Sequence, residues 1–148
     1  MDQTPPSNAY ERYCVPAGLE TRPAMKAVLA GGIYEPQTMA FMRAHAGGGD
    51  IVHAGTFFGD VLPGVAAAML DFVIPRDREV TIMQLDVEGH EKRALKGGYH
   101  LIHRCRPILI LEKQGNETWI QRTFRGLGYW VRGKLHGNFV YATEDLDL

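Results

Sequence analysis

The sequence predicts an α/β fold in which a mostly parallel sheet is covered by helices on both faces. Strand-like and helix-like segments alternate along most of the 148 residues. The strand candidate at 107–112 is a continuous apolar run, as in strands covered on both faces. Because alternating strands and helices are typical of parallel sheets joined by helical crossovers, the pattern favours a single α/β domain.

The N-terminal part is expected to be organised differently from the rest. Residues 1–32 contain recurrent prolines and a glycine pair, so we expect an arm with one short helical turn. Residues 33–148 form the predicted domain. Its first element is a helix at 35–46, because apolar side chains recur at helical spacing and a proline stands in the first turn. The glycine run at 47–49 ends that helix.

The centre of the chain alternates strands with helices. Short apolar runs predict strands, and apolar side chains at helical spacing predict helices. In order, we expect a strand at 50–55, a helix at 59–70, a loop at 72–78, a strand at 79–86, a helix at 90–103 and a strand at 107–112. After a further helix at 117–125, the segments 128–133 and 138–143 are typical of two strands around a turn, which predicts a hairpin-like ending.

Composition excludes several classes of function. The chain has 16 Lys and Arg against 17 Asp and Glu, which argues against a general nucleic-acid binder or a polybasic membrane binder. No apolar run approaches the roughly 18 residues typical of a membrane-spanning helix, and no signal peptide is visible at the start. The two cysteines have no metal or redox spacing. We therefore expect a soluble cytoplasmic protein with free thiols.

The first candidate site is the glycine-containing segment at 53–60. Gly55 and Gly59 lie between a buried strand and a predicted helix. Glycines in this position let the backbone approach a ligand closely, and the helix start directs N–H groups toward it. The alternative interpretation is a tight strand-to-helix turn with no ligand.

The second candidate site follows the strand at 79–86. Asp86, Glu88, His90 and Glu91 crowd the end of that strand. Carboxylates this close repel one another, which raises a carboxyl pKa or recruits a cation. The alternative is structural: Glu88 or the following glycine caps the next helix, and Glu91 complements the helix dipole.

Together these segments resemble the FkbM-type methyltransferases, which depend on S-adenosylmethionine. Residues 84–98, QLDVEGHEKRALKGG, are similar to the family's D-V-E-G-x-E block, and 106–112 to its R-P strand that ends in Glu. Residues 32–36 resemble its G-x-Y-E-P lead-in, and 51–60 its glycine-rich motif. The resemblance implies a Rossmann-like class I methyltransferase fold with an antiparallel last strand. It also implies methylation, most simply O-methylation, of a small-molecule or sugar-like acceptor.

The resemblance also assigns roles by position. It gives the cofactor S-adenosylmethionine to Glu35, His53, Gly55, Gly59, Asp60 and Asp86, and the chemistry to His90, Asp86 and Glu88. His90 is the candidate base, because imidazole is the side chain that ordinarily titrates near neutral pH. Asp86 and Glu88 orient the substrate or, in a minor alternative, bind a metal together with His90. His53 stands where the family usually has an acid, a loss that Asp60 partly offsets.

Compared with the family, the chain is short between the glycine-rich motif and the D-V-E-G block. The segment that supplies two further strands and the acid for the cofactor ribose has no counterpart here. We therefore expect the fold to be incomplete, with the strand at 50–55 at the sheet edge, beside 79–86 and then 107–112, 138–143 and 128–133. An uncovered edge promotes association, so we expect a homodimer. The alternative function is a non-catalytic module with lost or weak cofactor binding.

Overall fold

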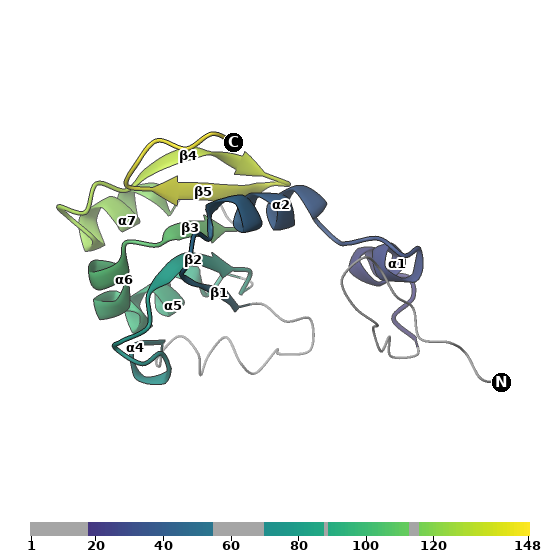
Figure 1. Cartoon of the computed structure of the whole chain (residues 1–148), viewed down its shortest axis with the longest axis horizontal. Helices are drawn as coiled ribbons and strands as arrows, with labels where there is room; N and C mark the ends of the chain where they lie inside the picture. The colour runs from purple at the N-terminus through teal and green to yellow at the C-terminus, as the bar shows by residue number, and fades with distance from the viewer. Residues whose placement is uncertain (1–17, 55–69, 88, 113–115) are drawn as a thin grey trace. The chain divides into compact units, whose positions relative to one another are not determined.

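The computed structural model describes residues 18–54, 70–87, 89–112 and 116–148. The chain separates into two compact units, Met1–Met39 and Ala40–Leu148 (Figure 1). In the first unit, helix α1 (Pro23–Leu29) begins with a proline, a residue favoured in the first helical turn. Helix α2 (Pro36–His45) starts in the first unit and ends in the second, close to the predicted bounds 35–46.

The second unit contains a five-stranded sheet. Its strands are β1 (Asp50–Ala54), β2 (Val80–Leu85), β3 (Ile108–Leu111), β4 (Trp130–Leu135) and β5 (Asn138–Ala142). They lie in the order β1-β2-β3-β5-β4, with β1, β2 and β3 parallel and β5 antiparallel to both of its neighbours (Figure 1). The predicted strand order and the antiparallel last strand are confirmed, and β1 lies at an edge of the sheet.

The C-terminal hairpin has the local geometry that its sequence favours. β4 and β5 are joined by His136 and Gly137, and Leu135 is paired with Asn138. Both turn residues have positive φ, 51° and 103°. A two-residue turn of this kind matches the twist of an antiparallel pair, so the hairpin follows from local sequence.

Two of the predicted segments, one helix and one loop, differ from the structure. The single helix predicted at 90–103 is wrong: it is divided into α5 (Glu91–Gly97) and α6 (Tyr99–Cys105) at Gly98. The loop predicted from residue 72 is wrong at its start, because α4 (Leu70–Val73) continues there. A contact from α4 explains the division of the predicted helix. The carboxylate of Asp71, on α4, accepts hydrogen bonds from the N–H groups of His100 (2.9 Å) and Leu101 (2.7 Å), and so caps α6.

Of the two remaining predicted helices, one is confirmed and the other lies outside the described residues. Helix α7 (Glu117–Thr123) confirms the helix expected at 117–125. The helix expected at 59–70 lies outside the described residues, except for its last position. In the described part of the chain, no helix has the length and apolar character needed to span a membrane.

Side chains on the two faces of the sheet form two cores. The larger core joins the sheet to α4, α5, α6 and α7 through Leu70, Leu95, Ile102 and Ile120. The smaller core joins the other face to α2, and its members are Phe41, Met42, Ile82, Ile110, Leu135 and Val140. We call this second face the α2 face. On edge strand β1, alternate residues follow the two faces: Val52 packs against the larger core, and Ile51 is 41% exposed.

Candidate functional site

The carboxyl ends of β1 and β2 are held side by side, and Asp86 follows directly after β2. The backbone N–H of Asp86 donates to the carbonyl oxygen of Ala54, the last residue of β1, at 2.8 Å. This bond extends the β1–β2 ladder by one residue, so the position of Asp86 is fixed by the sheet. Its side chain is exposed. The structure therefore brings a carboxylate to the end of β1, beside the start of the predicted glycine-rich segment.

His53 lies on β1, opposite Gln84 of β2. Neighbouring strands are roughly 4.8 Å apart, so these two residues are direct neighbours on one face of the sheet. Ile110, the partner of Gln84 on β3, belongs to the core under α2, which identifies this face as the α2 face. The His53 side chain is exposed. The structure thus brings His53 and Asp86 to the same edge of the sheet.

The turn between β2 and α5 carries His90 and Glu91. Gly89 has φ 91°, a conformation that favours glycine. His90 is half-buried at the N-cap of α5, and its backbone N–H donates to the carbonyl of Val87 at 3.0 Å. Glu91 is only 3% exposed, and its Oε1 accepts the N–H of Gly89 at 3.0 Å. The Glu91 carboxylate therefore has a structural role, because it fixes the turn.

Sequence reasoning missed Gln84, a polar side chain that lies buried at this edge. Gln84 is 6% exposed, and its Oε1 is buried without a hydrogen-bond partner. Leaving a buried acceptor unsatisfied costs about 1–3 kcal/mol. Thr81, on the same strand, differs: its hydroxyl donates to the carbonyl of Ala46 at 2.9 Å. The available signal was an amide inside a strand that is otherwise largely apolar.

Two further polar residues lie at this edge on the next strands. Glu112 follows β3, and Asn138 begins β5. The antiparallel register, which pairs Leu111 with Phe139, puts them opposite each other one step further along. Alternation along the strands assigns both positions to the face of Ile110 and Val140. We call His53, Gln84, Asp86, Glu112 and Asn138 the polar edge.

The other predicted site residues are not brought into this group by the described structure. Glu35 belongs to the first unit, precedes α2 with φ 50°, and accepts a hydrogen bond from the Thr38 hydroxyl at 3.2 Å. Gly55, Gly59, Asp60 and Glu88 lie outside the described residues. Within the described ranges, no three His, Cys, Asp or Glu side chains are grouped closely enough to hold a metal ion.

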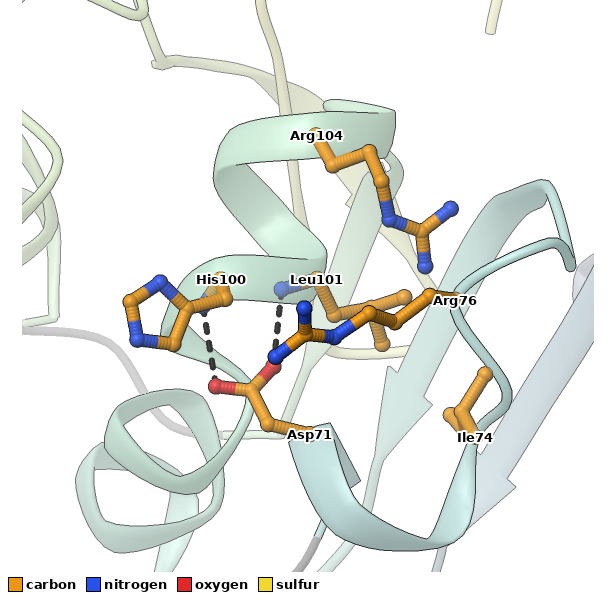
Figure 2. Close-up of a pocket in the computed structure, with 6 residues that line it drawn as sticks. All are labelled: Asp71, Ile74, Arg76, His100, Leu101 and Arg104. Atoms are coloured by element: carbon orange, nitrogen blue, oxygen red, sulfur yellow. Dashed lines mark hydrogen bonds between the residues drawn. The ribbon is translucent and has the colours of Figure 1, made fainter.

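A separate pocket lies away from the polar edge. It has a volume of about 280 Å³ and is lined by Asp71, Ile74, Arg76, His100, Leu101 and Arg104 (Figure 2). The Arg104 guanidinium donates to the carbonyl of Arg78, in the loop that leads into β2. This contact associates the pocket with the amino end of β2, whereas Asp86 follows its carboxyl end. Figure 2 shows the Asp71 carboxylate directed at the start of α6, so the pocket's one acid is used as a helix cap.

Comparison with known proteins gives one match. The family model described as the methyltransferase FkbM domain matches residues 65–138, which is half of the chain. The matched range runs through β2, β3 and β4 to the start of β5, and includes four of the five polar-edge residues. No curated protein and no solved structure gives a significant match.

Proposed function

Because this chain belongs to the FkbM methyltransferase domain family, we propose that it is a methyltransferase that uses S-adenosylmethionine. Its acceptor is a hydroxyl group of a small-molecule or sugar-like compound. We further propose that its sheet is a shortened form of the Rossmann-like class I methyltransferase fold. The observation that carries the proposal is the position of Asp86, tied by its backbone to the end of β1.

The place of the polar edge supports a ligand site. In open sheets with parallel strands, ligands bind outside the carboxyl ends of those strands. Asp86 presents a carboxylate there, and the buried Gln84 Oε1 has no partner. Both are hydrogen-bond acceptors: the Asp86 carboxylate fits the ammonium group of S-adenosylmethionine, and the Gln84 Oε1 fits a hydroxyl group of a sugar-like acceptor.

Within this proposal the residues have distinct tasks. S-adenosylmethionine supplies the methyl group when it is bound. Asp86 accepts hydrogen bonds from the ligand and holds it against the end of β1. His90, half-buried at the start of α5, takes the proton of the acceptor hydroxyl as a general base. Glu88, Gly55, Gly59 and Asp60 keep the cofactor and substrate roles proposed from the sequence.

A second candidate function is favoured by the edge position of β1. In the described part of the sheet no strand lies beyond β1. The adenosine side of the cofactor therefore has less sheet to rest on than in a longer methyltransferase. A non-catalytic binding module is the function that follows if the cofactor is no longer held.

The edge position of β1 also supports the proposal of a homodimer. β1 is an edge strand, and Ile51 on its outer face is 41% exposed. Unpaired strand edges promote association between chains. Light scattering at micromolar concentration tests this proposal, and a monomer at all concentrations would contradict it.

Calorimetric titration with S-adenosylhomocysteine, the demethylated product, tests the proposed enzyme. We expect binding to the wild type and roughly tenfold weaker binding to Asp86→Asn, because a charged acceptor becomes a neutral amide. Asp77→Asn, in the exposed loop before β2, is the matched control and should bind as the wild type does. His90→Ala should keep the binding and slow methyl transfer. Absence of heat and of thermal shift at millimolar S-adenosylhomocysteine would reject the enzyme and favour the binding module.

A further inference from the structure

The unsatisfied amide of Gln84 is a feature of the polar edge that the fold itself does not explain. The side chain is 94% buried. By alternation along the strand it shares the α2 face with Asp86, two residues further along the chain. Its neighbours in register are His53 on β1 and Ile110 on β3. Neither donates to its Oε1, which accepts no hydrogen bond.

A buried polar group normally finds a partner inside the fold, and Thr81 illustrates this on the same strand. Its hydroxyl bonds to the carbonyls of Ala46 (2.9 Å) and Asp50 (3.3 Å), so it links the chain before β1 to β2. Gln84 makes no such link. An apolar side chain of the same length would fill the same space next to Ile82 and Ile110 without an unsatisfied oxygen. The amide is therefore unfavourable for the ligand-free protein.

We propose that Gln84 is an acceptor-binding residue whose Oε1 accepts a hydrogen bond from a hydroxyl group of the bound acceptor. This inference rests on the proposed function, because it places the acceptor on the α2 face of the polar edge. A neutral amide oxygen requires a donor on the ligand. The proposed ligand class is a compound with several hydroxyl groups, such as a polyol or a monosaccharide. Asp86, two residues further along the chain and just past the end of β2, binds beside it.

The test uses Gln84→Met, which keeps the length of the side chain and removes both polar atoms. Thr81→Val is the matched control, because it removes a hydroxyl that has partners. In thermal unfolding without ligand, Gln84→Met should be as stable as the wild type or more stable, and Thr81→Val should be less stable. If Gln84→Met unfolds at a clearly lower temperature, the amide serves the fold and the proposal is overturned.

The ligand arm of the test uses myo-inositol and methyl α-D-glucopyranoside as probes, each with S-adenosylhomocysteine present. We expect at least one probe to bind the wild type, and to bind Gln84→Met about fivefold more weakly, which is the loss of one neutral hydrogen bond. S-adenosylhomocysteine alone should bind both proteins equally.

Three results would overturn the proposal: no probe binds the wild type, the probes bind both proteins equally, or Gln84→Met loses S-adenosylhomocysteine. The proposed function fails separately. If S-adenosylhomocysteine does not bind the wild type and the probe still binds in a Gln84-dependent way, the enzyme is rejected and the Gln84 assignment stands.

Discussion

The contact between Asp71 and the start of α6 leads to a prediction that is independent of function. The carboxylate accepts two backbone N–H groups, those of His100 at 2.9 Å and Leu101 at 2.7 Å. It thereby joins α4 to α6, through residues that are 29 and 30 positions apart in the chain. In Asp71→Ala both acceptors are lost, and the two N–H groups at the helix start have no side-chain partner.

The expected cost follows from the environment of each N–H group. The bond to His100 is exposed, so water replaces most of it, whereas the bond to Leu101 is partly buried. Loss of a helix cap costs about 0.5–2 kcal/mol, and we expect Asp71→Ala to lower the free energy of unfolding by about 1.5 kcal/mol. For a domain of this size, that corresponds to a fall of roughly 5 °C in the unfolding temperature.

Circular dichroism of the α-helical signal during heating measures this effect. Asp71→Asn keeps one acceptor oxygen and should lose about half as much stability. Asp77→Ala removes a carboxylate from the exposed loop that follows α4 and should unfold as the wild type does. An unfolding temperature of Asp71→Ala within about a degree of the wild type would refute the reasoning, because that difference is too small for a lost cap. An equal fall in the unfolding temperature of Asp77→Ala would refute it as well.

Two further predictions concern the stability of the folded chain. A Cβ added at Gly49 would meet the Thr81 Cγ2 and stand 3.0 Å from the carbonyl oxygen of Glu79. At Gly48, no described atom outside the two adjoining residues lies within 4 Å of an added Cβ. Gly49→Ala should therefore lower the free energy of unfolding by about 1–3 kcal/mol, Gly48→Ala should be tolerated, and equal urea midpoints would contradict this. Burial raises the pKa of Tyr141 to about 12, and it raises the pKa of Tyr129 as well. Because a raised pKa favours the folded state only while the phenol is protonated, stability should be full below the ordinary tyrosine pKa of about 10 and be lost as the pH rises above it. The part of the tyrosinate absorbance that Tyr141→Phe removes should develop together with unfolding; if that part developed near pH 10, the ordinary tyrosine value, in a folded protein, the prediction would be wrong.

The elements that sequence predicted well are those whose signals are local. β3 is a continuous apolar run, and the hairpin turn at His136 and Gly137 has residues that fit its conformation. The division of the helix at Gly98 was not predictable in this way. The glycine pair weakens the helix locally, but the new start at Tyr99 depends on Asp71, which approaches only after the chain has folded. A contact so distant in sequence has no signature in helical periodicity.

The candidate site shows the same contrast between local sequence signals and contacts that depend on the fold. Glu91 and Asp86 belong to one acidic cluster, for which pattern alone left a structural and a chemical interpretation open. The structure separates them by burial: Glu91 is 3% exposed and bound to the N–H of Gly89, and Asp86 is exposed beside Ala54. For Gln84 the sequence shows an amide in an apolar strand. Whether the fold supplies a partner is a property of the packed sheet.

If the sheet is a shortened form of the family fold, as proposed, cofactor binding is the part of the proposed activity that depends most on the length of the sheet. The polar edge draws on β1, β2, β3 and β5, and none of its residues depends on a strand beyond β1. The adenosine side of the cofactor is the side where such a strand would help. We therefore expect recognition of a hydroxylated acceptor to tolerate the short sheet better than cofactor affinity does. A dimer that covers β1 would restore part of that side, so cofactor binding and association should rise together with protein concentration. Cofactor affinity that does not change while the chain passes from monomer to dimer would separate the two and assign the cofactor to the single chain.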